Sequence, residues 1–468
     1  MAVNDIVFGT DGFRGLIARD FSFDNVKRIA QGLSDYMAYK GLKSPDKKVV
    51  IGYDRRFMSE EFARQFALVL RSNGISCVLS QTPLPTPAIS LLTHKKYALG
   101  VVITASHNHY LYNGVKIKSQ GRSIPPVMTG EIESHIPKVF NHPLSDVEIE
   151  KKDFRKEYCE YLNSKFDFKK LLSRLKGKIV IDFMYGASAE VCQEIFCGSK
   201  NVIVMNSRRD PLFGKSGAPE PVGKNLLELS KAVKENKALL GLALDGDGDR
   251  FAMLDDKGVY LTPCQIAPML FERLLETQKK PGKVVQAVSM GYLTKRIAKQ
   301  KNILLEELPV GFKFIAEKMI SEEVLFGVEE SGGYAWKGNI PERDGLMTAL
   351  AFINLVVEKN RKISEIYKEL EGKYGKSAFL RRDFKISKAI PNKHSFAVKV
   401  KKKLPKKIFD LKVSEAMTLD GLKIILENDW WFLIRPSGTE PLLRIYAETD
   451  SAKNTEKLLD FAQKNSVI

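Results

Sequence analysis

The chain has 468 residues, of which 44% are hydrophobic and 28% charged, and this composition is typical of a globular protein with about three or four domains. Its net charge of +18 favours anionic partners, but it does not choose among nucleic acids, membranes and small phosphates. Five cysteines without a Cys-x-x-Cys pair indicate reduced thiols in a cytoplasmic protein and argue against a zinc site or a disulfide framework.

Two further observations disfavour membranes and nucleic acids as partners. No apolar run approaches the roughly 18 residues that span a bilayer, and charge and glycine near the start argue against a secretory signal. The densest basic stretch, 399–407, holds six lysines and no aromatic residue that could stack on a base. We therefore expect the partner to be a small molecule. The chain itself is expected to be a monomer or a homodimer.

A strand-helix-strand pattern recurs three times along the chain. The expected strands cover 49–54, 75–79, 178–182, 202–204, 283–285 and 303–305, and the expected helices include 59–71 and 292–300. Three such units imply three similar α/β domains with mixed, mainly parallel sheets.

Beyond residue 375 the pattern changes to alternating strands followed by a closing helix. The expected strands are 379–386, 422–425, 430–434 and 442–446, and the expected helix is 451–463. This part is therefore a smaller C-terminal α+β domain, and the four domains are expected to surround a central cleft. The expected boundaries are 1–150, 151–257, 258–373 and 374–468.

The apolar run 99–103 ends abruptly at Thr-Ala-Ser-His-Asn, residues 104–108. Such a run predicts a buried strand, and ligands of open α/β sheets bind in loops at the carboxyl ends of strands. Ser106 is therefore a candidate site residue, although a lone serine could simply cap an ordinary turn. A Ser-His-Asn hydrolase is disfavoured because triad partners normally come from separate parts of the fold.

Asp245, Asp247 and Asp249 alternate with two glycines directly after the apolar strand 241–244. Glycine lets the backbone turn tightly enough for the three carboxylates to converge, and a divalent cation would relieve their repulsion. Oxygen ligands of this kind select magnesium, calcium or manganese. An EF-hand is disfavoured because Arg250 stands where its loop requires glycine, and a non-binding acidic turn is the remaining alternative.

Two further loops carry polar groups, one suited to an oxyanion and the other to sugar hydroxyls. The stretch Arg-Pro-Ser-Gly-Thr-Glu-Pro, 435–441, offers a guanidinium, two hydroxyls and backbone N–H groups to an oxyanion. The stretch 326–333 places two carboxylates and a hydroxyl on a glycine-rich loop, and carboxylates accept hydrogen bonds from sugar hydroxyls. Taken alone, each stretch could also be an ordinary surface turn.

Together with Phe-Gly-Thr-Asp-Gly-Phe-Arg-Gly at 8–15, these stretches resemble the α-D-phosphohexomutase family, which includes phosphoglucomutases and phosphomannomutases. The family's motifs occur in its order: 8–15 with 104–108, then 245–250, 329–333 and 435–441. The resemblance covers nearly the whole chain, and the ordered set is far more specific than any single motif.

The resemblance implies a phosphoserine at Ser106 and one Mg²⁺ per chain. The implied metal ligands are the phosphorylated Ser106 together with Asp245, Asp247 and Asp249. The cation would bind an oxygen of the phosphate and neutralise developing charge.

Other catalytic roles are also implied by the resemblance. Arg250 would stabilise the same phosphate oxygens, and Lys116 and Arg14 would assist proton transfer at the sugar oxygen. His107, beside the serine, is counted with the catalytic residues. Glu329 and Ser331 would bind sugar hydroxyls. The phosphate that is not reacting would be held by Arg435, Ser437, Gly438, Thr439 and Lys313.

The implied reaction moves phosphate between O1 and O6 of a hexose through a hexose 1,6-bisphosphate, which also serves as activator. Gly333 stands where many mannose-using members carry histidine, so glucose is expected to be preferred and mannose to be possible. The usual proline after Ser-His-Asn is replaced by His109, which leaves the course of that loop open. The alternatives are a phosphoglucosamine mutase and, from another class, a non-catalytic phosphosugar-binding regulator, against which Ser106 and Lys116 argue.

Overall fold

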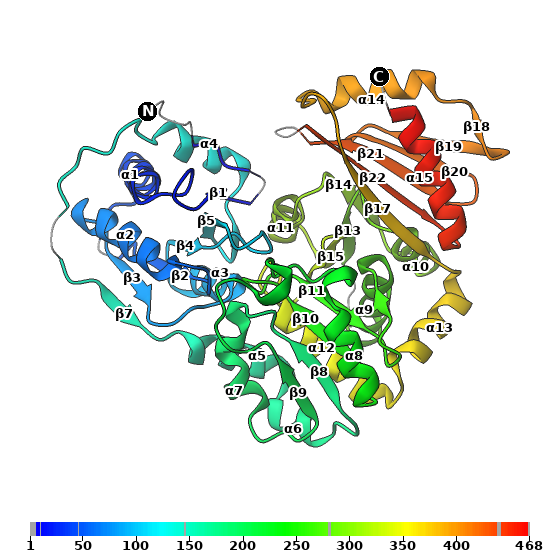
Figure 1. The fold of residues 1–468 in the computed structure, drawn as a ribbon, viewed down its shortest axis with the longest axis horizontal. Coiled ribbons are helices and arrows are strands. Elements are labelled where there is room, and N and C mark those ends of the chain that lie inside the picture. The colour runs from blue at the N-terminus through cyan, green and yellow to red at the C-terminus, as the bar shows by residue number, and fades with distance from the viewer. Residues whose placement is uncertain are drawn as a thin grey trace. The chain divides into compact units, whose positions relative to one another are not determined.

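The computed structural model describes residues 6–9, 11–44, 46–144, 147–278, 282–437 and 441–466. The chain forms two compact units. The first comprises Met1–Tyr260 and Gly333–Ile363, and the second comprises Leu261–Gly332 and Ser364–Ile468. Figure 1 labels the helices and strands of each unit.

The first sheet of the first unit has a parallel centre and an antiparallel edge. Its strand order is β1 (Phe13–Leu16), β5 (Tyr112–Ser119), β4 (Leu99–Ile103), β2 (Val49–Tyr53), β3 (Cys77–Ser80) and β7 (Glu150–Lys152), and β6 (Arg122–Ser123) pairs with β5. β2 is parallel to β3 and β4, whereas β5 is antiparallel to β4 and β1. Its helices are α1 (Phe23–Tyr39), α2 (Ser59–Ser72), α3 (Thr86–Lys95) and α4 (Pro126–Ser134).

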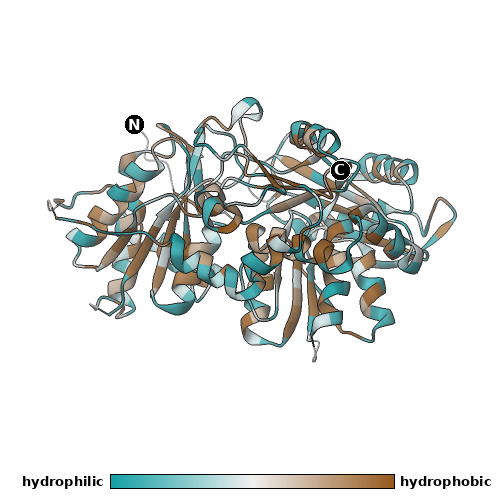
Figure 2. Ribbon diagram, turned by 90° about the horizontal axis from the view of Figure 1, so that it is seen from below, coloured by the Kyte–Doolittle hydropathy of each residue, from teal (hydrophilic) through white to brown (hydrophobic). Residues whose placement is uncertain are grey.

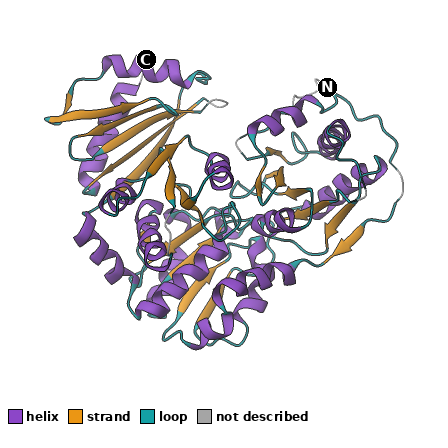
Figure 3. Cartoon of the chain, turned by 180° about the vertical axis from the view of Figure 1, so that it is seen from behind, coloured by secondary structure: helices purple, strands orange, loops and turns teal. Residues whose placement is uncertain are grey.

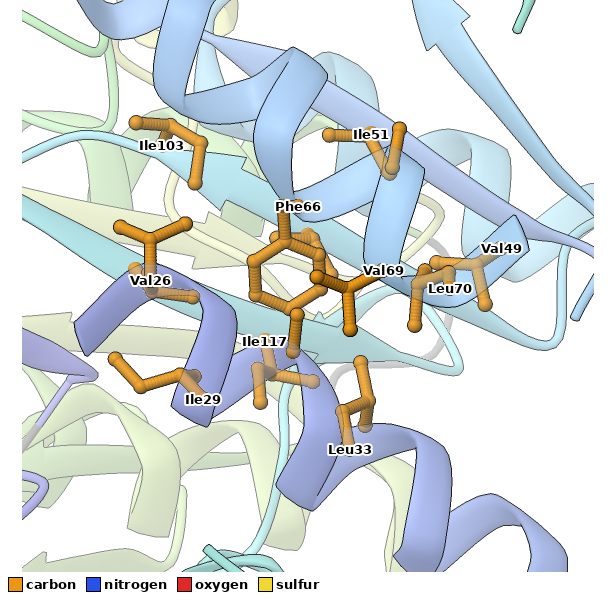
Figure 4. Close-up of a cluster of buried hydrophobic side chains, with 14 of the residues drawn as sticks. Val26, Ile29, Leu33, Val49, Ile51, Phe66, Val69, Leu70, Ile103 and Ile117 are labelled. Carbon is orange, nitrogen blue, oxygen red and sulfur yellow. The ribbon is translucent and has the colours of Figure 1, made fainter. Parts of the chain in front are cut away.

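A hydrophobic core lies between this sheet and the helices α1 and α2 (Figure 4). Val26, Ile29 and Leu33 of α1 are fully buried, as is Phe66 of α2. Fully burying a side chain of this size stabilises a fold by about 1.5–3 kcal/mol. This packing fixes the ends of β2 and β4, from which the site loops emerge.

The second sheet of the first unit is also mixed. Its strand order is β12 (Tyr260–Leu261), β11 (Phe251–Leu254), β10 (Gly241–Leu244), β8 (Ile179–Asp182) and β9 (Val202–Met205). β10 and β9 run parallel to β8, and β11 is antiparallel to β10. The unit also contains α5 (Arg155–Phe166), α6 (Phe168–Ser173), α7 (Cys192–Phe196), α8 (Leu227–Glu235), β16 (Gly333–Trp336) and α12 (Gly345–Lys359).

The second unit contains a parallel sheet and an antiparallel sheet. β14 (Leu305–Leu308), β13 (Lys283–Ala287) and β15 (Val324–Glu329) are parallel, with α9 (Pro263–Thr277), α10 (Tyr292–Gln300) and α11 (Phe312–Ser321). The antiparallel sheet has the order β17 (Ala378–Lys385), β22 (Leu442–Thr449), β21 (Trp431–Pro436), β20 (Leu422–Leu426), β19 (Leu411–Met417) and β18 (Lys407–Ile408). The remaining helices are α13 (Ile363–Tyr374), α14 (Lys393–Lys403) and α15 (Ala452–Ser466).

Within each unit the strands are the apolar interior and the helices lie beside them. Figure 2 shows brown, hydrophobic strands and helices with teal, hydrophilic faces, and Figure 3 shows purple helices flanking orange sheets. The predicted fold class of α/β domains with mixed sheets followed by a C-terminal α+β domain is confirmed. The four predicted domain boundaries stay predictions.

Two predicted strands, 75–79 and 303–305, were placed about two residues too early. β3 begins at Cys77 and β14 at Leu305. The apolar residue after each helix closes the helix instead, because the Ile75 N–H donates to the Leu70 carbonyl and the Ile303 N–H to the Ala298 carbonyl. This is the hydrogen bond of a Schellman cap, which uses up an apolar residue before the strand starts.

Candidate active site

Ser106 lies in the loop that follows β4, as the sequence predicted. Its hydroxyl is buried and donates to Asp245 Oδ2 over 2.7 Å, while its backbone N–H donates to Thr104 Oγ1 over 2.8 Å. The backbone of Ser106 has φ +55°, in the left-handed region that non-glycine residues rarely adopt. The structure therefore places this hydroxyl against the aspartate loop in a strained conformation.

Asp245, Asp247 and Asp249 form a buried cluster in the loop between β10 and β11. One ligand atom from each lies within 4.8 Å of the others. Asp247 Oδ1 and Asp249 Oδ1 are buried without a hydrogen-bond partner, whereas the second oxygen of each carboxylate is held by the protein. We call Ser106 and these three aspartates the aspartate cluster.

The donors on the second oxygens orient these carboxylates. Thr86 Oγ1 donates to Asp247 Oδ2 over 2.5 Å. Arg343 Nη2 donates to Asp249 Oδ2 over 2.7 Å. The Lys116 ammonium donates to both oxygens, each over 2.8 Å. Each carboxylate is thus fixed on one side and open on the other.

The cluster fits a hard divalent cation. Burial raises the pKa of Asp245 well above its usual range, and the neighbouring Asp247 and Asp249 raise it further. Such mutual repulsion, together with two buried carboxylate oxygens without hydrogen-bond partners, is what an oxygen-coordinated cation would relieve. The donor set of carboxylates and a serine oxygen favours Mg²⁺, Ca²⁺ or Mn²⁺ over softer metals.

Lys116, on β5, is a buried cation surrounded by carboxylates. Its ammonium lies 2.9 Å from Asp11 Oδ2 and 2.8 Å from oxygens of Asp247 and Asp249. Burial alone would lower the pKa of Lys116, but the three carboxylates outweigh it and raise the pKa. Lys116 is therefore protonated, and the three neighbouring carboxylates balance its positive charge.

The other predicted residues of the first unit lie around the same loop. Arg14, on β1, donates from Nη1 to Asn108 Oδ1 over 3.0 Å. His107 Nδ1 lies 3.4 Å from Ser106 Oγ, and burial followed by the charges of Arg250 and Arg14 holds the His107 pKa well below its usual range. The backbone N–H of Arg250 donates to an oxygen of the aspartate loop. The structure brings all of these residues together.

The predicted sugar-binding residues lie in the second unit, at the end of β15. Glu329 is buried, and Ser331 Oγ donates to Glu329 Oε1 over 2.5 Å. The neighbouring Glu330 accepts a hydrogen bond from Ser289. This loop therefore holds a carboxylate and a hydroxyl side by side.

Among the predicted phosphate-binding residues of the second unit, Arg435 is held by the carboxylate of Asp420. Arg435 Nε donates to Asp420 Oδ2 over 2.7 Å, and the Val310 N–H donates to the same oxygen over 3.1 Å. Val310 precedes the turn that leads to Lys313, in the first turn of α11. Asp420 therefore connects Arg435 with the segment directly before α11. Ser437 is buried beside Arg435, and the predicted residues Gly438 and Thr439 lie outside the described residues.

Sequence reasoning missed several residues that hold the cluster. Thr86 and Arg343 donate to the cluster from distant segments, and no local spacing pointed to them. Asp11, which lies in the motif 8–15 but was not named as a site residue, pairs with Lys116 and Arg343. Asp54 and Arg56 organise the Ser106 loop. They follow β2, which lies beside β4 and parallel to it, so the shared edge of the sheet was a usable signal.

Known domain families match the chain from near its start to near its end. The matches are Phosphoglucomutase/phosphomannomutase alpha/beta/alpha domain I at residues 5–142, domain II at 156–258, domain III at 262–374 and the C-terminal domain at 396–464. The chain belongs to the phosphoglucomutase/phosphomannomutase family. Because members of this family are mutase isomerases, the chain is an intramolecular phosphotransferase of the phosphohexomutase superfamily.

Individual family members are similar over nearly their full length. A phosphoglucosamine mutase of Caldicellulosiruptor saccharolyticus is 30% identical over 475 residues, covering 97% of both chains. A phosphoglucomutase/phosphomannomutase of Thermococcus kodakarensis is 28% identical over 468 residues, covering 98% of both. The crystal structure of a Thermus thermophilus protein, whose name places it among the phosphomannomutases, aligns with a TM-score of 0.86 and 31% identity over 99% of both chains. In the part of the chain that the structure describes, every helix is too short or too polar to cross a bilayer.

Proposed function

We propose that this protein interconverts hexose 1-phosphate and hexose 6-phosphate through a phosphoserine at Ser106 and a hexose 1,6-bisphosphate intermediate. The observation that carries the proposal is the hydrogen bond from the Ser106 hydroxyl to Asp245, inside a carboxylate cluster with two oxygens that lack hydrogen-bond partners. A phosphorylated serine there needs no adjacent base to donate its phosphoryl group.

We propose Mg²⁺ as the cation of this site, one per chain. Asp245, Asp247 and Asp249 would hold it together with an oxygen on Ser106. When bound, Mg²⁺ supplies neutralisation of the charge that develops on the transferring phosphoryl group. Arg250 supplies further positive charge next to the aspartate loop, since its Nε lies 4.0 Å from Asp249 Oδ1.

The remaining predicted residues are assigned by what their side chains can do. Lys116 and Arg14 are cations beside the serine loop, so we assign them a supporting role in proton transfer at the sugar oxygen, as hydrogen-bond donors that keep their positive charge. Glu329 and Ser331 accept and donate hydrogen bonds, which suits sugar hydroxyls. The phosphate that is not reacting is assigned to Arg435, Ser437, Gly438, Thr439 and Lys313, with a hexose 1,6-bisphosphate as activator.

Glucose phosphates are proposed as the preferred substrates, because Gly333 replaces the histidine of many mannose-using members. Glucose and mannose differ only at C2, where one hydrogen bond is worth about 0.5–1.5 kcal/mol, or about 2- to 13-fold in specificity constant. Mannose phosphates are therefore expected to be used more weakly, not excluded.

Glucosamine phosphates are the second candidate substrates, and the comparisons favour them. Several curated relatives are named phosphoglucosamine mutases, at 28–30% identity. Like-charge repulsion between the sugar ammonium and nearby cations would disfavour an amino sugar, but three carboxylates balance the charge of Lys116. Repulsion of the sugar ammonium by Lys116 is correspondingly small.

One set of assays tests the function and the choice of substrate. Purified protein should carry phosphate on Ser106 after incubation with glucose 1,6-bisphosphate, as read by intact mass and peptide mapping. Specificity constants should then be measured for the 1-phosphates of glucose, mannose and glucosamine. Failure to phosphorylate Ser106 would remove the mechanism, and a glucosamine value equal to or above that of glucose would overturn the preferred substrate.

A further inference from the structure

The guanidinium of Arg56 is enclosed by the loop that carries Ser106, and all five of its N–H groups have an acceptor. Nη2 donates to the carbonyls of Ser106 over 2.6 Å and of Asn108 over 2.7 Å. Nη1 donates to the carbonyls of His109 over 3.0 Å and of Tyr112 over 3.1 Å. Nε donates to a carboxylate, so the side chain uses its full donor capacity.

A second layer of contacts fixes Arg56 itself. Asp54 Oδ2 accepts the Nε hydrogen bond over 3.1 Å, and Asp54 Oδ1 accepts from the Arg56 backbone N–H over 2.9 Å. Thr104 Oγ1 donates to Asp54 over 2.6 Å and accepts from the Ser106 N–H. The ring of Phe213 lies 4.9 Å from the guanidinium carbon. Arg56 is completely buried, so these contacts determine its position.

This arrangement accounts for the unusual backbone of the serine loop. A non-glycine residue at φ +55° persists only where the surrounding structure over-determines it. Four carbonyls between Ser106 and Tyr112 converge on one cation, whose planar, fixed donor fork sets their directions. Lysine carries the same charge but only three donors and no fork, so it would leave loop carbonyls without partners.

We propose that Arg56 is a positioning residue that sets the place of Ser106 Oγ for phosphoryl transfer, an inference that rests on the proposed phosphoserine function. In these contacts Arg56 touches neither the Ser106 hydroxyl nor the three aspartates of the aspartate cluster. It acts through the backbone of the serine loop. Misplacing a reacting group by about 1 Å costs on the order of 100-fold in rate.

The adjacent residue provides a matched control. Arg55 is also buried, but its Nε donates to Glu190 over 2.8 Å and its Nη1 to the Ser207 carbonyl over 2.6 Å, away from the serine loop. Arg56→Lys and Arg55→Lys are therefore the same change at neighbouring buried positions. Arg56→Lys should lower kcat about 100-fold with KM for glucose 1-phosphate within about threefold, whereas Arg55→Lys should keep both near wild type.

Two further readouts separate positioning from simple loss of stability. Hydrogen exchange of the amides of residues 104–112 should accelerate in Arg56→Lys while exchange in α1 and α2 stays at the wild-type rate. Low millimolar guanidinium should partly restore kcat to Arg56→Ala. The proposal would be overturned if Arg56→Lys left both kcat and the exchange of residues 104–112 unchanged. It would also be overturned if exchange accelerated in α1 and α2 as well and guanidinium did not restore kcat to Arg56→Ala. If wild-type protein has no mutase activity, the proposed function fails, and the exchange data still decide whether Arg56 orders the loop.

Discussion

The aspartate cluster and the candidate residues of the second unit differ in how they are held. Asp249 is contacted by Lys116 and Arg343, which come from segments more than 90 residues apart from it. Arg435 and Glu329 instead each meet a partner close in sequence, Asp420 at 15 positions and Ser331 at two. Residues that share a partner are energetically coupled, as Asp247 and Asp249 are through Lys116, whereas Arg435 and Glu329 have different partners in the contacts described above. We propose chemistry for the aspartate cluster and substrate recognition for the residues of the second unit.

The largest expected effect is at Ser106. Ser106→Ala should abolish mutase activity, with a loss of at least about 10⁴-fold, because no phosphoryl donor remains. Its melting temperature should change little, since the removed hydroxyl is small. Ser134→Ala, at the exposed end of α4, is the control. Residual activity within tenfold of wild type would show that the serine is not the donor.

The next effect tests the cation site. Asp249→Asn should weaken Mg²⁺ binding in calorimetric titration and lower kcat by about 10²- to 10³-fold, because one anionic ligand is lost. Asp182→Asn is the matched control, since Asp182 is a buried aspartate at the end of β8 whose oxygen accepts from the Met184 N–H and the Asn206 amide. Equal Mg²⁺ affinity in the two variants, or full activity in excess chelator, would contradict the assignment.

A smaller effect is expected in the second unit. Arg435→Gln should raise KM and lower kcat/KM by about 10- to 100-fold, because a charge-assisted contact to phosphate is lost. Phosphorylation of Ser106 by hexose 1,6-bisphosphate and its slow hydrolysis should persist. Arg382→Gln, which removes a half-buried arginine paired with Glu456 and Asp460, should change neither quantity. A loss of Mg²⁺ affinity in Arg435→Gln would contradict the expectation that Arg435 does not affect the cation site of the aspartate cluster.

A further effect, on stability and not on activity, concerns the buried carboxylates of the first unit. Burial raises the pKa of Asp344 to about 7 from a usual value near 3.8. The folded state therefore binds more protons than the unfolded state between these values, so wild-type stability should fall as the pH rises from about 4 to about 7. The fall amounts to at most about 4 kcal/mol. Asp344 Oδ1 accepts from Tyr158 and from the Met347 N–H, and asparagine preserves this acceptor.

Asp344→Asn should therefore gain stability relative to wild type as the pH rises. The check is the urea midpoint of both proteins at pH 4.5, 6 and 8, with the difference between them increasing at each step. A difference that is constant with pH would show that Asp344 is ionised in the folded state.

Local signals were read well from the sequence, and distant ones were not. The three aspartates fall within five consecutive positions, so their spacing was enough to find the cluster, and the helix Tyr292–Gln300 was predicted to the residue. Thr86 and Arg343 reach the cluster only because the fold brings remote segments to it. The strand β14 was placed too early because the charges of Glu306 and Glu307 are not typical of a strand interior, whereas the apolar residues just before them are. Lysines neutralise both of them, including Lys283 and Lys423.

The contact between the serine loop and the aspartate loop has an evolutionary consequence. A Cβ at Gly246 would lie 2.5 Å from the Ser106 carbonyl oxygen, so not even a methyl group fits between the two loops. Thr86 provides a second contact between the two domains. Its N–H donates to the Asp247 carbonyl and its hydroxyl donates to the Asp247 carboxylate. Recombination that replaces the first α/β domain but keeps the second would bring together two loops that were not matched to each other. Because the loops are in close contact here, even a small difference in shape would produce a steric clash. Within this family, the two segments are expected to be inherited together, and chimaeras that exchange them as a pair should stay active where single exchanges fail.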